Sequence, residues 1–110
     1  MSSVIKLVQG DTRPALVCTI TDDNTGSPID LTGCTCRLKF REQDSTTLKA
    51  TLTGTLTDPV DGVVEFYWAS VPTSLDGSEG NYQGEIEIIF PDGQIQTVFD
   101  VLNFYLREDF

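Results

Sequence analysis

Polar and apolar side chains alternate with a period of two along most of this chain, which is typical of β-strands with one buried face. The clearest run covers residues 34–41, whose apolar side chains share one face and whose polar side chains share the other: Cys34, Cys36, Leu38 and Phe40 against Thr35, Arg37, Lys39 and Arg41. No window has the 3.6-residue spacing of an amphipathic helix. The pattern therefore predicts an all-β protein.

Similar alternation recurs in other short runs, separated by turn sequences rich in Gly, Asp, Asn and Pro. These runs are residues 4–8, 15–21, 47–57, 63–68, 81–90 and 94–108. In the run 47–57, the apolar side chains share one predicted core face: Leu48, Ala50, Leu52 and Leu56. The last run changes phase between Val101 and Leu102, which indicates a bulge or a strand that a partner also buries.

About seven or eight short strands with almost no helix predict an immunoglobulin-like antiparallel β-sandwich. With 110 residues, and no linker or repeat to divide them, we expect one domain over residues 1–110, with a C-terminal tail that docks on a partner. The sequence contains no stretch of 18 apolar residues, so it predicts no membrane span. The start, MSSVIKLVQGD, has no apolar core of a signal peptide, so we expect synthesis in a cytoplasm.

The formal net charge is −10, and it is distributed unevenly. Residues 1–55 carry six acids and six bases, whereas residues 56–110 carry eleven acids and the single base Arg107. A nucleic-acid phosphate backbone is a poor partner for such a chain. Two interpretations remain open: a solvated surface, or opposite-sign surfaces through which copies meet head to tail or face a basic partner.

Cys34 and Cys36 resemble a metal or redox pair, but their spacing argues against both. Residues i and i+2 of a strand lie about 6.5–7 Å apart, from the strand rise, at the edge of disulfide reach. A zinc site usually needs four ligands, and the chain has 3 cysteines and no histidine. Cys18 can approach either one across the core, yet the odd count leaves a thiol over. We expect all three to be buried packing residues.

The absence of histidine removes the Ser-His and Cys-His nucleophile pairs, and no glycine-rich phosphate cradle is present. An EF-hand loop beginning at Asp22 fails, because Ser27 stands at the required glycine and Gly33 at the required glutamate. An irregular calcium site among the aspartates remains an alternative; its candidates are Asp22, Asp23, Asp30, Asp58 and Asp61. We expect no enzyme activity, no cofactor and no resident metal.

Charged ladders and C-terminal aromatics are the candidate interface residues. The basic ladder Arg37, Lys39 and Arg41 pairs with the acidic pair Glu85 and Glu87 inside the domain, or one of them serves an interface.

The tail supplies Phe104, Tyr105 and Phe110 as anchors, with core packing the alternative for Phe104. Trp68 shares its predicted face with Val64 and Phe66, so we expect it buried, which argues against a sugar-stacking role.

Gly80-x-Tyr82 resembles the tyrosine corner of immunoglobulin-like domains, although Ser78 stands where Asp is typical and Gly84 where their second disulfide cysteine lies. Four segments in order resemble small virion proteins of tailed bacteriophages, similar to the N-terminal domain of the phage upper-baseplate (BppU-like) protein. They are Gly10-Asp11-Thr12, Pro28-Ile29-Asp30-Leu31-Thr32-Gly33, Gly62-Val63-Val64, and Gly80-x-Tyr82 leading to Phe90-x-Asp92-Gly93.

The resemblance implies a non-enzymatic virion structural protein attached to the tail or baseplate, with no catalytic residue to carry over. Its implied partners are other virion proteins, in multiple copies, with neither nucleic acid nor membrane among them. Assembly would take place in the host cytoplasm. A decoration protein of the phage head is the alternative, and a carbohydrate- or host-surface-binding module is a third, less favoured one.

Overall fold

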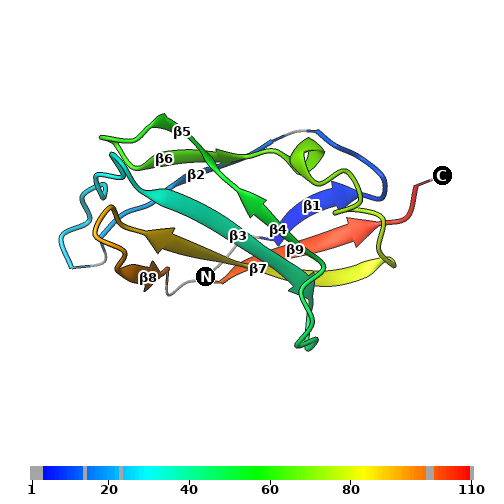
Figure 1. The fold of residues 1–110 in the computed structure, drawn as a ribbon. Coiled ribbons are helices and arrows are strands. Elements are labelled where there is room, and N and C mark those ends of the chain that lie inside the picture. Colours follow the sequence, from blue (N-terminus) through cyan, green and yellow to red (C-terminus); the bar gives the residue numbers. More distant parts are fainter. Residues whose placement is uncertain (1–3, 14, 23, 99–100, 110) are drawn as a thin grey trace.

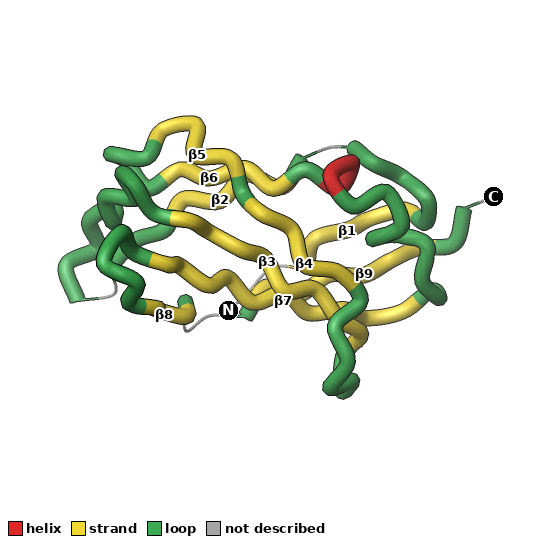
Figure 2. Tube along the Cα trace, in the orientation of Figure 1, coloured by secondary structure: helices red, strands yellow, loops and turns green. Residues whose placement is uncertain are grey.

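Two β-sheets pack face to face in the computed structural model, which describes residues 4–13, 15–22, 24–98 and 101–109 (Figures 1 and 2). The larger sheet contains β1 (Val4–Val8), β3 (Thr35–Glu42), β4 (Ala50–Thr53), β7 (Gly80–Ile89), β8 (Ile95–Thr97) and β9 (Leu102–Arg107). The smaller contains β2 (Leu16–Thr19), β5 (Thr55–Asp58) and β6 (Val63–Phe66). A single 3-10 turn, η1 (Trp68–Ser70), follows β6. The prediction of an all-β sandwich is confirmed.

The strand order is β1-β9-β7-β3-β4 in the six-stranded sheet, with β8 also paired to β7, and β2-β6-β5 in the three-stranded sheet. Within the described residues the strands number nine, and β1 pairs with β9 in parallel while the other pairs are antiparallel. The sequence predicts fewer strands and an antiparallel fold. The count is higher because the runs 47–57 and 94–108 each form two strands.

Gly54 divides the run 47–57, and there the chain crosses from one sheet to the other. β4 pairs with β3, whereas β5 pairs with β6. A Cβ on Gly54 would lie 2.4 Å from Val64 Cγ2 and 2.9 Å from Phe66 Cε1, so a larger residue would collide with the core. Leu48 was expected in the core but is 45% exposed, because β3–β4 pairing begins only at Ala50.

The run 94–108 forms β8 and β9, which lie on the same edge of β7. Thr97 pairs with Glu87 and Leu102 pairs with Gly84, so the register along β7 shifts by two residues between β8 and β9. A shift of two keeps the parity, and even-numbered residues of both strands pair with even-numbered residues of β7. The expected change of phase is therefore not present between the two described strands. Phe99 lies outside the described residues, and Val101 is 36% exposed.

An aromatic cluster fills the core at the end of the sandwich where η1 lies. The Phe40 ring stacks on the Tyr82 ring at 5.1 Å between centroids and 7° between planes. Trp68 and Phe104 meet the same ring edge to face, at 5.1 Å and 5.3 Å. Trp68 is 1% exposed, as its alternation with Val64 and Phe66 predicts. Such pairs add about 0.5–1.5 kcal/mol each to the stability that comes from burial.

Candidate interface on the outer face of the six-stranded sheet

The two charged ladders lie side by side on the outer face of the six-stranded sheet. The β3–β7 register places Arg37 opposite Glu87 and Lys39 opposite Glu85. Lys39 Nζ and Glu87 Oε2 form an ion pair at 3.0 Å, with side chains 33% and 14% exposed. Part of the ladder is therefore neutralised inside the domain, which is the first of the two interpretations above.

Arg41 has no directly opposite acid. Its partner in the register is Gln83, which carries no charge. Within the described part of the chain, neither Arg37 nor Arg41 forms an ion pair, and Glu85 forms none either. The ladder thus keeps two unneutralised guanidinium groups, the side chains best suited to bidentate contact with a partner's carboxylate.

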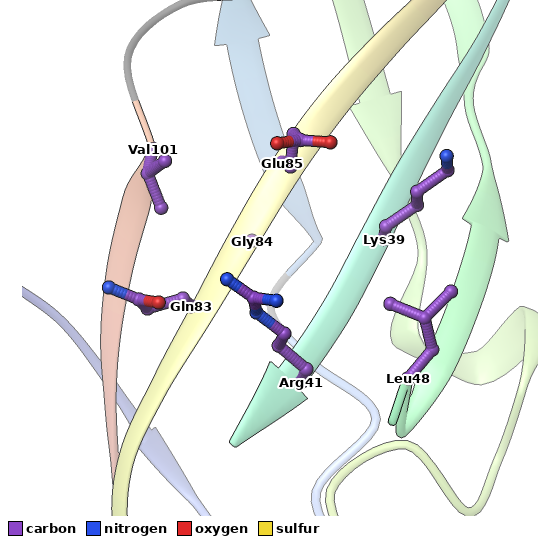
Figure 3. Close-up of a pocket in the computed structure, with 7 residues that line it drawn as sticks. All are labelled: Lys39, Arg41, Leu48, Gln83, Gly84, Glu85 and Val101. Carbon is purple, nitrogen blue, oxygen red and sulfur yellow. The ribbon is translucent and has the colours of Figure 1, made fainter. Parts of the chain in front are cut away.

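A shallow hollow of about 60 Å³ lies beside Arg41 (Figure 3). Its lining residues are Lys39, Arg41, Leu48, Gln83, Gly84, Glu85 and Val101. The Arg41 side chain reaches from β3 toward β7, with its guanidinium beside Gly84, and Leu48 and Val101 stand on opposite sides of the hollow. A hollow of this size is suited to one side chain of a partner, since ligand pockets typically enclose about 300–1,000 Å³. The sequence does not predict that Leu48, Gln83 and Val101 line this hollow, because alternation shows which residues point outward but not which of them are neighbours on the sheet.

The C-terminal aromatic residues have different positions. Phe104 is 1% exposed and packs against Phe40 and Trp68, so it belongs to the core and cannot anchor a partner. The reason is parity, because Phe104 pairs with the inward-facing Tyr82. Tyr105 is 36% exposed, and its hydroxyl donates to Glu79 Oε2 at 3.1 Å, which raises the pKa of Tyr105. Phe110 lies outside the described residues.

The cysteines pack against the core, and the prediction that all three are buried holds for two of them. Cys34 and Cys36 are buried, Cys18 is half-buried, and all three are free thiols. Burial raises the pKa of both Cys18 and Cys36 to about 11. They remain protonated near neutral pH, and a protonated thiol is neither a nucleophile nor a metal ligand.

The aspartates proposed as calcium ligands are spread over separate turns. Asp30 accepts hydrogen bonds from the backbone N–H and hydroxyl of Thr32, and these lower the pKa of its carboxyl. A hydrogen bond with Asp58 raises the pKa of Asp61. Across residues 4–13, 15–22, 24–98 and 101–109, no three metal-ligating side chains come together. Asp23 is outside these ranges.

The tyrosine corner is present. The Tyr82 hydroxyl donates to the carbonyl oxygen of Ser78 at 2.8 Å, which closes the turn that leads into β7. Gly77 gives this hydroxyl its space, since a Cβ there would lie 2.2 Å from it. Trp68 and Tyr82 are each 1% exposed, so neither ring is available for sugar stacking, whereas Tyr67 is 40% exposed.

A larger groove of about 640 Å³ lies where β2 and β8 leave the sandwich open. Its described lining includes Ile20, Ile86 and Leu102, and among the described residues Asp22 is the one ionisable side chain and none is aromatic.

The chain is similar in fold to a phage protein domain. A solved structure, the "N-terminal domain of phage TP901-1 ORF48", superposes with a TM-score of 0.64 over 97% of this chain and 85% of that chain, at 15% sequence identity. At that identity the likeness establishes the fold, and the resemblance predicted from the ordered turn motifs is confirmed at that level.

No protein-family model and no curated protein matches this sequence. Among the described residues, no helix is long and apolar enough to cross a membrane.

Proposed function

We propose that this protein is a non-enzymatic structural protein of a bacteriophage particle, a single accessory module attached to the tail or baseplate. The observation that carries the proposal is the likeness in fold to an N-terminal phage protein domain, which extends over 97% of the chain. A fold alone does not determine a function, so the surface chemistry must agree with it.

The chemistry of the surface supports a docking role. The attachment surface in this proposal is the basic ladder with its neighbours: Arg37, Lys39, Arg41, Glu85, Glu87 and Tyr105. The unpaired guanidinium group of Arg41 lines the same hollow as the exposed Leu48 and Val101, a mixture of charge and apolar area that suits a protein partner. The partners are other virion proteins, bound in several copies, and assembly takes place in the host cytoplasm.

The competing functions have less support. An enzyme without histidine would depend on carboxylates, and the neighbouring carboxyls of Asp58 and Asp61 are both exposed and line neither the hollow nor the groove. A sugar-binding module needs exposed aromatic rings over a groove, while Trp68 and Tyr82 are buried. Attachment to the phage head remains an alternative, which the following experiment separates.

The test is size-exclusion chromatography with light scattering of the purified protein, alone and mixed with purified tail and capsid components of its phage. Stoichiometric binding to the tail components is the expected result. Binding to the capsid components instead would move the protein to the head. A protein that ignores both components would overturn the proposal, and a glycan array would then test the third reading.

A further inference from the structure

Charge segregates between the two sheets. The strands of the six-stranded sheet contain five of the chain's 7 basic residues, Lys6, Arg37, Lys39, Arg41 and Arg107, against three acids. The strands of the three-stranded sheet contain two acids, Asp58 and Glu65, and none of their described residues is basic. One sheet of a strongly acidic protein is thus basic.

The basic residues all point to the same side. The burial pattern places the odd-numbered residues of β3 and β7 outward, and Lys6 shares its side with Tyr105, its exposed partner in β9. We call this outer surface the basic face, defined by Lys6, Arg37, Lys39, Arg41 and Arg107. Exposed apolar groups adjoin it, among them Val4 and Leu48, which are 51% and 45% exposed.

The opposite surface of the sandwich is acidic. Glu65 lies at the centre of the three-stranded sheet, between Val17 of β2 and Thr55 of β5. Asp58 pairs with Val63 and so shares the outer side with Glu65, and Asp61 follows in the next turn, where the neighbouring Asp58 carboxyl raises the pKa of Asp61. We call this surface the acidic face, defined by Asp58, Asp61 and Glu65.

The acidic face also carries apolar area. Val17 is 59% exposed and Tyr67 is 40% exposed, with the Tyr67 hydroxyl bonded to Glu65 Oε1 at 3.2 Å. Val60, in the turn after Asp58, is 64% exposed. Both faces therefore present exposed apolar side chains next to charges of one predominant sign, the arrangement of two complementary halves of an interface.

We infer that the basic face binds the acidic face of a second copy of this chain, head to tail. Such a contact uses two different surfaces of each copy, so it leaves both ends of a pair open and generates a ring or a filament. The inference rests on the docking role proposed above for the basic ladder, but its test needs only this protein.

The overall charge of −10 does not prevent the contact at physiological salt. Charges farther apart than about 8 Å are largely screened at 0.15 M ionic strength. The molecule measures 42 × 28 × 23 Å, so most of the acidic loops of one copy lie beyond that distance from an interface on the other. The charges at the contact itself are screened much less.

Two variants test the inference, and in each of them two charged side chains are replaced by uncharged amides, so that no new attraction is created. The first removes basic-face charges through Arg37→Gln and Arg41→Gln. The second removes acidic-face charges through Asp58→Asn and Glu65→Gln, which keeps an acceptor for the Tyr67 hydroxyl. Sedimentation velocity on each variant alone should show association weakened about tenfold or more relative to wild type. An equimolar mixture should recover a 1:1 pair that grows no further, because each variant keeps the face that the other lost.

Matched controls change the same charges elsewhere. Arg13→Gln lies outside the strands, and Asp44→Asn lies in the β3–β4 turn at a residue with φ 67°, a conformation that Asn accepts. Both should associate as wild type does. A wild-type protein that stays monomeric at millimolar concentration would overturn the inference. So would an acidic-face variant that associates normally, since the basic face would then meet a copy of itself. Binding of a wild-type monomer to tail components would meanwhile leave the proposed function standing.

Discussion

The two sheets are built from strands of different length, and they use their residues differently. In the six-stranded sheet, β3 and β7 pair over eight residues, from Thr35–Ile89 to Glu42–Tyr82. Their inward positions are almost fully buried, which frees the outward positions to carry charge. In the three-stranded sheet, strands of four residues cover the core, and the inward residues of β2, Leu16 and Cys18, remain half-buried. The long strands β3 and β7 bury their inward residues almost fully, whereas the short strand β2 buries its inward residues only in part.

This difference implies unequal local stability. A segment with fewer buried apolar contacts opens at a lower free-energy cost than the centre of the core. We expect the three-stranded sheet, and β2 in particular, to open before the β3–β7 pair. The five predictions that follow test this comparison in order of decreasing effect.

The largest effect is expected at Trp68, which joins the two regions because it follows β6 in the chain and packs on Phe40 of β3. Trp68→Ala should lower the free energy of unfolding by about 3–5 kcal/mol, through lost burial and the cavity left behind. Urea denaturation measures it. Tyr67→Ala, at an exposed neighbour, should cost much less. A Trp68→Ala protein as stable as wild type, but deficient in glycan binding, would contradict the core role.

Gly54 is the point where the chain leaves one region for the other. Gly54→Ala places a methyl group against Val64 and Phe66 and should cost roughly 1–3 kcal/mol as an overpacking change. Thr55→Ala, one residue on and exposed, should change stability by about 0.5 kcal/mol or less. Equal denaturation midpoints for the two variants would mean that the crossing has room to adjust.

The thiols compare the sheets directly, because Cys18 lies in β2 and Cys36 in β3. Burial raises the pKa of each to about 11, so both thiols are protonated near neutral pH and a difference in alkylation rate reports mainly their access to the reagent. Cys18 should be modified about tenfold faster or more, because its strand opens more easily. Mass spectrometry of partly alkylated native protein measures the ratio. Equal rates would show that the two sheets open together.

The tyrosine corner belongs to the more stable region. Tyr82→Phe leaves the Ser78 carbonyl without its hydroxyl donor and should cost about 0.5–1.5 kcal/mol. Tyr105→Phe removes an exposed hydrogen bond to Glu79 in the same sheet, and it should lower the free energy of unfolding by less than Tyr82→Phe does. A larger loss at Tyr105 in thermal unfolding would reverse this ranking.

Alternation predicted the parts of the fold that depend on one strand at a time. The buried and exposed faces of 34–41 and 81–90 are as expected, because a period of two leaves little choice once a core exists. The sheet crossing at Gly54 was missed, since Leu52 and Leu56 keep one parity while the chain changes sheets. The parallel β1–β9 pair was also missed, because pairing between the two ends of the chain leaves no local pattern.

For the same reason, the sequence predicts the candidate site only in part. The outward position of Arg37, Lys39 and Arg41 follows from parity alone. Their neighbours follow from the β3–β7 register, which the sequence does not state, and so the pairing of Lys39 with the diagonal Glu87 could not be chosen in advance. The sequence leaves Phe104 open between core and interface because the apolar positions of its run do not keep one parity, and its pairing with the inward-facing Tyr82 places it in the core.

The smallest effect concerns that ion pair, which tests whether the charged face stabilises the fold. Lys39→Ala and Glu87→Ala, combined in a double-mutant cycle, should give a coupling energy of about 0.2–1 kcal/mol, since both side chains retain some contact with water. The coupling should fall in 1 M salt. Arg37 is the matched control, because it lies directly opposite Glu87 without an ion pair. The double-mutant cycle of Arg37 and Glu87 should therefore give a smaller coupling energy. A coupling near zero for Lys39 would mean that the ladder contributes nothing to folding, which leaves binding as the reason for its charges.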